Sequence, residues 1–335
     1  MMSPHRSHQG RRGARTARPG CKTPRPTVAP RTGGKAPRTR STRRRRMVEP
    51  WKVRPMDVAD VEAVMAVVDA ANAEAARKRG ESPRPRPPDQ VALTRQGHVR
   101  FVERDAPGAW VAESSGMVIG VAESIRRGDF WGLSMLFTDP RSQSQGVGRI
   151  LLEASSAYGS GATMRMIQSS SDPRAMRLYS MAGLEMHPSA GLSGSPDRRA
   201  IPRRLGGRSA DASDLDLVAA TEASIGRSRT EDVESVLQAG NRLDVVDDGR
   251  GRGWMLWHPG RLVMLGATDA ETASTLLWRY LAGAEGEVSV YGLTAAQNWA
   301  FAVGHAARVT VEVTGAMFVD GMDVPGPWIP SGWYF

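Results

Sequence analysis

The sequence predicts an α/β (α+β) protein with two mixed-sheet domains in tandem, preceded by a disordered basic tail. Three observations support this prediction. The length of 335 residues suits about two domains. Short apolar strands alternate with helical patterns, which favours mixed sheets covered by helices. The segment that begins at Val53 also recurs from Gly207 in the same order of residue types, which indicates two related units.

The predicted boundaries follow changes in composition. We expect a first domain over residues 50–205, a second over residues 206–320, and an aromatic segment over residues 321–335. The end of that segment, from Pro327 onward, is too apolar to be freely solvated, so it should pack on the domains.

Residues 1–46 differ from the rest of the chain. They hold 13 Arg and 2 Lys without Asp or Glu, a charge of +15, whereas the remaining residues sum to −5. Such a composition buries too little apolar surface to offset the entropy of ordering, so we expect disorder. Three interpretations stay open. The tail is an arm that binds nucleic acid nonspecifically, a solvated arm without function, or an untranslated stretch ahead of a start at Met47.

The composition argues against several classes of protein. No run of about 18 apolar residues exists, so we expect no membrane span, and the tail has no apolar core of a secretory signal. The single cysteine, Cys21, excludes an internal disulfide framework, and the six histidines lack the spacing of metal ligands. These features predict a cytoplasmic protein without a bound metal.

In the first domain, Asp57 and Asp60 stand where carboxylates cap a helix start. The residues Arg126-Arg127-Gly128-Asp129 provide a turn between two strands. We expect, in order, a helix at 58–79, a Pro-rich loop at 82–88, a helix at 89–104, strands at 109–113, 117–125 and 130–138, a helix from 146, a strand at 162–168, a helix at 173–182 and a strand from 184.

The second domain repeats a reduced version of this pattern, again with two aspartates, Asp211 and Asp214, at the first helix start. We expect a helix at 212–224, strands at 254–258 and 261–267, a helix at 270–283, a strand at 287–293, a helix at 295–304 and a strand at 308–313.

The most informative stretch lies between the strand at 130–138 and the helix after it. The strand ends at Asp139-Pro140, a polar loop follows, and Gly146-Val147-Gly148 opens the helix. Glycines at a helix start let a ligand approach the backbone, and the free N–H groups with the helix dipole suit a pyrophosphate. A Rossmann fingerprint is excluded because its third glycine would be Leu151, and a P-loop because no Gly-Lys-Ser/Thr follows.

Two motifs carry a resemblance to a known family. The hexapeptide Gln143-Ser144-Gln145-Gly146-Val147-Gly148 resembles the Gln/Arg-x-x-Gly-x-Gly/Ala signature of the GNAT superfamily of N-acetyltransferases. The stretch from Asp172 to Leu184 is similar to that family's second signature, Asn-x-x-Ala-x-x-Leu-Tyr-x-x-x-Gly-Phe. The resemblance implies acetyl-CoA as cosubstrate, with the pyrophosphate on the glycine loop and the pantetheine arm along the end of strand 130–138.

The residues that the resemblance assigns to the cofactor are Leu136, Phe137, Thr138, Gln143, Ser144, Gln145, Gly146, Val147, Gly148, Arg149 and Asp172. Asp172 departs from the usual Asn and lacks the amide donors, so its contact with the pantetheine arm stays open. Tyr179 occupies the family's usual position for the general acid, and a core aromatic on a helix face is the alternative.

The general base is less determined, because strand 130–138 holds no carboxylate. Glu123 on the neighbouring strand and Asp129 at the turn are the nearest candidates, and a water chain past Ser134 would serve equally well. A solvated or structural role for either carboxylate is the alternative.

The second domain resembles a GNAT domain that has lost catalysis. The stretch Thr268-Asp269-Ala270-Glu271-Thr272 replaces the glycine loop with two acidic groups, and Ala300 stands where the tyrosine would be. We therefore predict an N-acetyltransferase that moves an acetyl group from acetyl-CoA to a primary amine by direct attack in a ternary complex. The alternative is a non-catalytic acyl-CoA-binding or regulatory protein.

The expected partners follow from these assignments. We expect an amine acceptor on a small molecule or a protein, nucleic acid only through residues 1–46, and no membrane. The assembly should be a monomer with an internal pseudo-dimer, or a homodimer.

Overall fold

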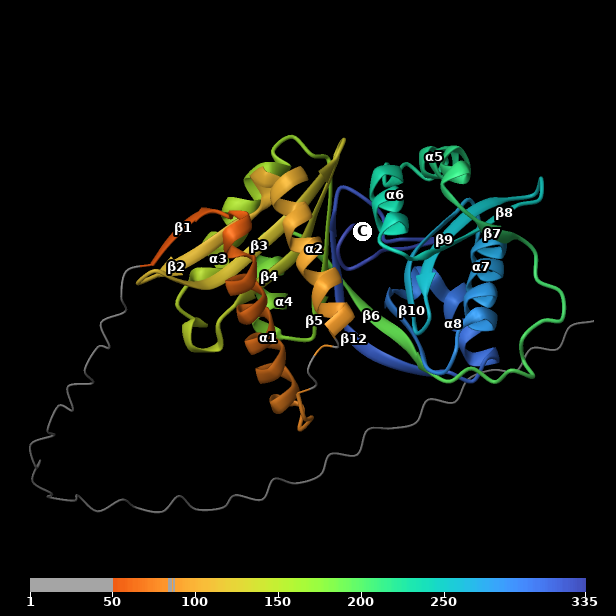
Figure 1. Ribbon diagram of the computed structural model, residues 1–335, viewed down its shortest axis with the longest axis horizontal. Helices are drawn as coiled ribbons and strands as arrows, with labels where there is room; N and C mark the ends of the chain where they lie inside the picture. Colours follow the sequence, from red (N-terminus) through yellow and green to blue (C-terminus); the bar gives the residue numbers. More distant parts are fainter. Residues whose placement is uncertain (1–50, 84–85, 87) are drawn as a thin grey trace, which may run out of the picture. The chain divides into compact units, whose positions relative to one another are not determined.

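The computed structural model describes residues 51–83, 86 and 88–335 (Figure 1). The predicted basic tail, residues 1–46, and the alternative start at Met47 lie outside the described residues. The Pro-rich loop expected at 82–88 falls partly outside them.

The first half of the chain follows the predicted order of elements. Its helices and strands are β1 (Trp51–Pro55), α1 (Val61–Lys78), α2 (Pro88–Arg104), β2 (Trp110–Ser114), β3 (Met117–Arg127), β4 (Phe130–Thr138), α3 (Val147–Ser156), β5 (Met164–Ser170), α4 (Pro173–Met181) and β6 (Glu185–Gly194).

The second half contains three elements that were not predicted, α6, β8 and β13. Its elements are β7 (Arg208–Ala210), α5 (Leu215–Ser224), α6 (Thr230–Gln238), β8 (Arg242–Asp247), β9 (Arg252–His258), β10 (Arg261–Ala267), α7 (Ala270–Gly283), β11 (Val288–Leu293), α8 (Asn298–Ala306), β12 (Thr310–Asp320) and β13 (Trp328–Ile329). The strand expected at 308–313 is therefore wrong in length, because β12 continues to Asp320.

The internal repeat has a physical basis at the first helix of each half. Asp57 forms a capping box with Asp60, and Asp211 forms one with Asp214. Arg54 donates to Asp60 at 2.7 and 2.8 Å. Arg208 makes the same paired contact with Asp214. The two motifs therefore adopt one local structure, in which an arginine from the preceding strand holds the capping carboxylate.

The two halves exchange strands within a shared sheet. Its order is β1-β2-β3-β4-β5-β12-β6-β11, so β12 of the second half lies between β5 and β6 of the first. β12 pairs with β5 from Gly315 to Asp320 and with β6 from Thr310 to Val319. Figure 1 shows β6 and β12 side by side between the two halves. Hydrogen bonding thus crosses the expected boundary at 205/206, which itself stays a prediction.

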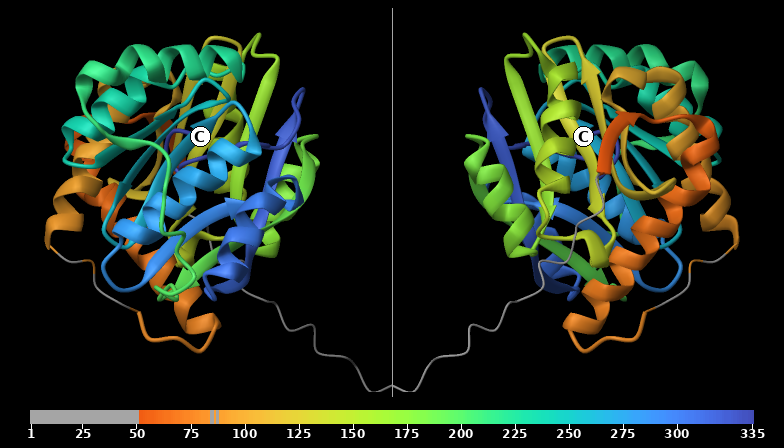
Figure 2. Two further views of the ribbon diagram at one scale, coloured as in Figure 1. Left: turned by 90° about the vertical axis from the view of Figure 1, so that its right-hand side faces the viewer. Right: turned by 90° about the vertical axis from the view of Figure 1, so that its left-hand side faces the viewer.

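Helices cover both faces of the first half's strands, as the side views in Figure 2 show. On one face, α1 and α2 bury an apolar cluster that includes Val64, Phe101 and Val121. On the other, α3 and α4 pack Leu152 and Tyr179 against Trp131 of β4. The strand β4 therefore lies between two distinct cores, and each of its faces leads to a different set of helices.

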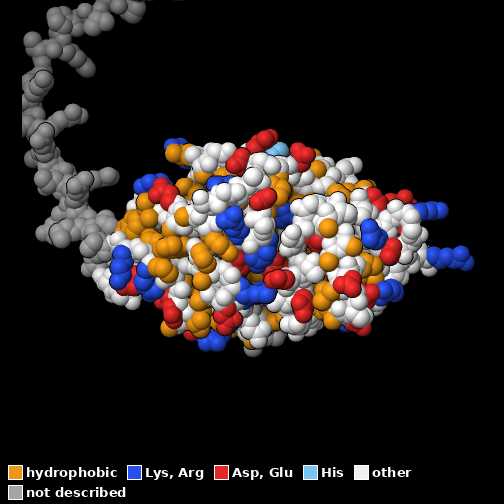
Figure 3. All heavy atoms as spheres, turned by 90° about the horizontal axis from the view of Figure 1, so that it is seen from above, with side chains coloured by type: hydrophobic (Ala, Val, Ile, Leu, Met, Phe, Trp, Pro, Cys, Tyr) orange, Lys and Arg blue, Asp and Glu red, His pale blue; other side chains and the backbone are white. Residues whose placement is uncertain are grey.

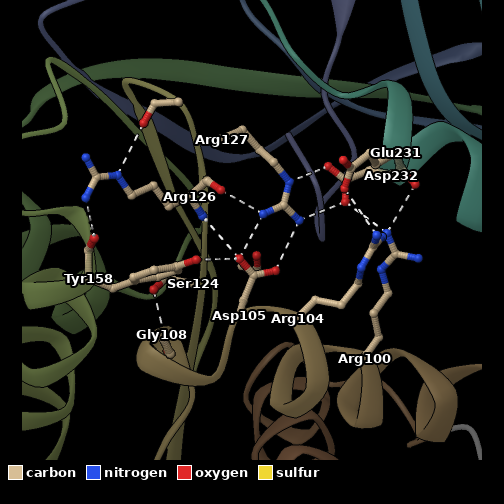
Figure 4. Close-up of polar contacts among 12 residues, drawn as sticks. Arg100, Arg104, Asp105, Gly108, Ser124, Arg126, Arg127, Tyr158, Glu231 and Asp232 are labelled. Atoms are coloured by element: carbon tan, nitrogen blue, oxygen red, sulfur yellow. Dashed lines mark hydrogen bonds and ion pairs between the residues drawn. The ribbon is translucent and has the colours of Figure 1, made fainter.

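A network of ion pairs also joins the two halves (Figure 4). Arg127 of β3 donates to Asp105 at 2.8 and 3.1 Å and to Asp232 of α6 at 2.8 Å from two nitrogens. Arg100 donates to the same Asp232 at 3.1 Å. Because Asp232 is fully buried, these donors are needed to offset the loss of its hydration. The position of α6 is therefore tied to the first half.

Residues 321–335 connect the halves once more. β13 adds to the edge of the second sheet, whose order is β13-β10-β9-β8-β7, with Gly266 opposite Trp328 and Leu265 opposite Ile329. Trp328 and Phe335 are buried, Phe335 completely. Apolar burial thus holds this segment at its middle and at its last residue.

The surface of the described residues mixes both signs of charge. Figure 3 shows acidic and basic side chains interspersed over the face seen from above. Among the described helices, none has the length and apolar character to cross a bilayer. The same part of the chain contains no cluster of three or more His, Cys, Asp or Glu side chains arranged for a metal ion.

Candidate active site

The strands β4 and β5 separate part-way along their length. They pair in parallel from Phe130 opposite Met164 to Leu133 opposite Ile167. Beyond that point no described strand pairs with the side of β4 that faces β5, although β4 continues to Thr138. The separation starts at Ser134, which is an extra residue in the β3–β4 register and therefore a bulge. On this side residues 134–138 thus have no strand partner, and such an open edge suits an extended ligand.

The glycine loop follows this open edge directly. Ser144 has a φ of 63° and Gly146 a φ of 91°, and Gly146 begins α3 without a side-chain cap. The backbone N–H groups of Gly146, Val147 and Gly148 make no hydrogen bond with any described residue. Free amides at the positive end of a helix form an anion site.

Glycine is present at positions 146 and 148 for different physical reasons. Gly146 is required by its left-handed backbone, which other residues adopt at a cost. A Cβ at Gly148 would meet only Thr138 Cγ2 at 3.8 Å and Leu178 Cδ2 at 4.0 Å, which are ordinary contacts. The fold alone therefore does not require glycine at 148, whereas close approach of a ligand would.

Three polar side chains connect the loop with α4. Gln143 Nε2 donates to the Thr138 carbonyl at 3.4 Å, and Arg174 donates to Gln143 Oε1. Asp172 accepts from the Arg174 N–H at 2.9 Å and caps α4, whose first residue is Pro173. The Arg174 guanidinium, paired with Asp172, lowers the pKa of that carboxyl. Asp172 is thus an ionised cap where the family has an amide.

Two further residues assigned to the cofactor point to solvent. Arg149 is exposed on α3 and pairs with Glu153 at 2.8 Å. Gln145 is exposed in the loop, and its Nε2 donates to the Arg141 carbonyl at 3.3 Å. Both side chains are available to a ligand at the cost of one weak surface contact each.

Tyr179 lies on α4 and is almost completely buried. Its ring packs edge-on against Phe318 of β12, with 5.4 Å between centroids. Burial, helped by the charge of Asp172, raises the pKa of the phenol, so Tyr179 keeps its proton. The hydroxyl makes no hydrogen bond with a described residue. Tyr179 is therefore a protonated donor without a protein acceptor, positioned by a strand of the second half.

Glu123 is fully buried on β3, and its Oε1 lies 2.8 Å from Nδ1 of His98 on α2. Burial raises the pKa of Glu123, although the contact with His98 opposes the shift. Glu123 Oε2 and His98 Nε2 are buried without a partner among the described residues. Glu123 is therefore not solvated, while a structural role through its contact with His98 remains the alternative to a role as the base. The sequence also missed His98, whose only signal is its place on the apolar face of α2 beside Phe101.

The other two candidates for proton transfer lie differently. Asp129 is exposed in the turn before β4, at the opposite end of that strand from the open edge. Ser134 is at the bulge, and its hydroxyl donates to the Trp333 carbonyl at 2.6 Å. The structure thus brings Ser134 to the point of strand separation but not Asp129.

In the second half, protein groups fill the equivalent places. Asp269 caps α7 by accepting from the N–H and hydroxyl of Thr272, both at 2.8 Å. The free edge of β10 is covered by β13, which pairs with Leu265 and Gly266. Ala300 is completely buried in a helix without a phenol. An anion and an extended ligand would both be excluded here.

Comparison with known families agrees with this geometry. Residues 69–184 match the model described as the acetyltransferase (GNAT) family, a range that contains the open edge, the glycine loop and Tyr179. This segment is a GNAT acetyltransferase domain. None of the curated proteins compared with the chain matches it.

Solved structures extend the similarity beyond the GNAT domain. A Pyrococcus horikoshii protein provisionally described as an acetyltransferase has a TM-score of 0.66 at 14% identity, covering 85% of this chain and 96% of its own. A GCN5-related N-acetyltransferase from Sphaerobacter thermophilus gives 0.54 at 16% identity, covering 84% and 98%. A tandem GNAT protein of the clavulanic acid biosynthesis pathway gives 0.50 at 17% identity, covering 84% and 99%. At these identities the similarity concerns the fold, and it includes the second half as a GNAT-like unit in tandem with the first.

Proposed function

We propose that the GNAT domain transfers an acetyl group from acetyl-CoA to a primary amine by direct attack in a ternary complex. One observation carries the proposal. The open edge of β4 continues into an uncapped helix start, while both places are filled by β13 and Asp269 in the second half. A selective opening of this kind suits a ligand that is extended at one end and anionic at the other.

Coenzyme A has this form. In the proposed complex its pantetheine arm adds to β4 along Leu136, Phe137 and Thr138, and its pyrophosphate accepts from the amides of residues 146–148. Gln143, Ser144, Gln145 and Arg149 surround the diphosphate as polar and cationic neighbours, and Asp172 stays at the rim as the cap of α4. The free amides support this placement because each lacks a protein acceptor.

The proposed chemistry follows from where the thioester would end, at the bulge of Ser134. The amine nitrogen forms a bond to the acetyl carbon, and the carbon–sulfur bond then breaks. Unpaired N–H groups on β4 stabilise the oxyanion, and Tyr179 gives its proton to the departing sulfur. Glu123, in contact with His98, is the proposed acceptor of the amine proton.

The acceptor is proposed to be a primary amine on a small molecule or a protein, and the cytoplasmic location predicted from the sequence belongs with this proposal. The mixed charge of the described surface offers no broad basic area for nucleic acid on the face in Figure 3. We propose that any contact with nucleic acid is made through residues 1–46.

Two measurements on the full chain test the proposal. Titration calorimetry with coenzyme A should give one site per chain, because the second half is closed at both equivalent places. Release of coenzyme A thiol from acetyl-CoA should then depend on an added amine from a panel of primary amines. Binding without amine-dependent release across the panel would overturn the transferase and favour the acyl-CoA-binding alternative, while a stoichiometry of two would overturn the assignment of a single open site.

A further inference from the structure

The last part of the aromatic segment, residues 331–335, leaves the second half and ends on the first half's candidate site. Ser331 is buried, and its Oγ accepts from the N–H groups of Trp333 at 3.0 Å and Tyr334 at 2.9 Å. The carbonyl of Trp333 accepts from Ser134 at 2.6 Å. The segment is therefore a hydrogen-bonded turn fixed to the bulge of β4.

The first half leaves space for the rings of this segment. A Cβ at Gly97 of α2 would clash with the ring of Trp333, and a Cβ at Gly132 of β4 would clash with the ring of Phe335. Tyr334 stacks on Phe101 with 6.2 Å between centroids. Glycines on two facing elements thus admit two aromatic rings, as a built interface requires.

Behind Trp333 lies the pair that the proposed mechanism needs. The centroid of the Trp333 ring is 5.4 Å from that of His98, and His98 contacts Glu123. His98 and Glu123 are fully buried, whereas Trp333 is half-buried. The ring therefore stands between solvent and a titratable pair whose outer atoms, His98 Nε2 and Glu123 Oε2, have no described partner.

The two faces of β4 indicate from which side Tyr179 and the amine approach the thioester. Tyr179 approaches from the face of α3 and α4, where it packs with Trp131 and Leu133. Ser134 and Gly132 meet the aromatic segment on the opposite face, which α1 and α2 cover. If Tyr179 protonates the leaving sulfur from one face, the amine arrives on the other, where Trp333 lies beside the bulge.

We propose that Trp333 forms the acceptor-side wall of the GNAT site and limits the size of the amine that reaches the bulge at Ser134. This inference rests on the proposed transferase function. The acceptor class inferred is a primary amine on an unbranched chain, because the Trp333 ring lies directly against α2 at Gly97 and its carbonyl is held at the bulge by Ser134. The second half thereby sets the acceptor specificity of this site, in addition to positioning Tyr179 through Phe318.

The test compares Trp333→Ala with a matched control, Trp299→Ala, in the full chain. Trp299 is also a partly buried tryptophan, but it packs in the second half and donates to the Gly326 carbonyl. For each protein, kcat/KM is measured with an unbranched and a branched primary amine. Trp333→Ala should raise the branched-to-unbranched ratio by about tenfold or more, as a pocket enlarged by several carbons does, whereas Trp299→Ala should leave the ratio unchanged. An unchanged ratio in both would overturn the inference.

A second readout is independent of turnover. Carbethoxylation of His98 by diethyl pyrocarbonate, followed by peptide mass spectrometry, should be slow in the unaltered chain and in Trp299→Ala and at least tenfold faster in Trp333→Ala. Ser134→Ala, which removes the hydrogen bond to the Trp333 carbonyl, should give an intermediate rate and serves if Trp333→Ala does not fold. Equal rates of His98 modification in all variants would overturn the proposal that Trp333 forms a wall of the site. If neither the unaltered chain nor any variant binds coenzyme A, the transferase proposal fails. The modification rates would still decide whether Trp333 covers His98.

Discussion

Replacing Gly148 with alanine should affect cofactor binding without disturbing the fold. The Cβ of Gly148→Ala would lie 3.8 Å from Thr138 Cγ2 and 4.0 Å from Leu178 Cδ2, so the folded chain accepts it. Position 148 lies inside α3, where alanine is favoured over glycine by about 1 kcal/mol. The free energy of unfolding should therefore stay equal or rise by up to about 1 kcal/mol.

Binding of coenzyme A should respond in the opposite direction. The methyl group would stand where a phosphate oxygen approaches the free amides, and loss of one hydrogen bond to a charged group costs about 1.5–3 kcal/mol. This corresponds to a dissociation constant about 10- to 150-fold higher. Titration calorimetry with coenzyme A measures the constant, and urea unfolding measures the stability of the same preparation.

A second glycine supplies the matched control for backbone strain. Gly146 has a φ of 91° and Gly249 a φ of 79°, and neither has an atom within 4 Å of an added Cβ. Alanine at either position should destabilise the fold by a similar amount, about 1–2 kcal/mol, because both residues are left-handed. Of these two variants, only Gly146→Ala should weaken the binding of coenzyme A. If Gly148→Ala binds coenzyme A as tightly as the unaltered chain, the start of α3 is not the pyrophosphate site.

Two further predictions concern the proton-transfer groups. Tyr179→Phe should lower kcat for thiol release by about 10²- to 10⁴-fold, because the proton donor is lost while the ring contact with Phe318 stays. The affinity for coenzyme A, measured by calorimetry, should not change. An unaltered kcat would remove Tyr179 from the mechanism. Burial raises the folded-state pKa of Glu123 above its unfolded value, so its stabilising contribution is complete below the unfolded pKa and lost as the pH rises through the folded pKa. Urea unfolding between about pH 4 and pH 8 should therefore show Glu123→Gln gaining stability relative to the unaltered chain as the pH rises, and a difference that does not vary with pH would contradict this reasoning.

Local features of the fold were predictable from the sequence because their causes are local. The aspartates at 57 and 211 cap helix starts through atoms two and three residues away, so the motif alone specifies the structure. The same holds for Gly146, whose left-handed φ follows from the loop between a strand and a helix. Each of these interactions closes within one turn of chain.

The strand exchange had no such local cause. β12 pairs with β5, and Asp320 lies opposite Arg165, far away in the sequence. An alternating apolar strand carries no mark of which partner it will join, so the sequence predicted a strand near 308–313 but not its neighbours or its continuation past Gly315. The same reason explains why Phe318, which positions Tyr179, was not foreseen.

The buried pair of Glu123 and His98 shows where residue-by-residue interpretation fails. The sequence makes Glu123 a candidate base, with a solvated or structural role as the alternative, and burial of a lone charge is costly. That cost is reduced by His98, which lies 25 positions earlier on a different element. Only the packing of α2 on β3, completed by Trp333 from the second half, reveals that the two groups meet.

The covered strand edge of the second half and the position of Trp333 on the first half have a common origin. β13 pairs with β10 at Leu265 and Gly266, next to the end of that strand, as Leu136 and Phe137 stand next to the end of β4. By filling this edge, β13 excludes an extended ligand from the second half and fixes the point from which residues 331–335 start. An open β10 edge would leave those residues without an anchor, and Trp333 could not be held at the bulge of β4. The second half therefore contributes to the first half through the same segment that covers the edge of its own strand β10.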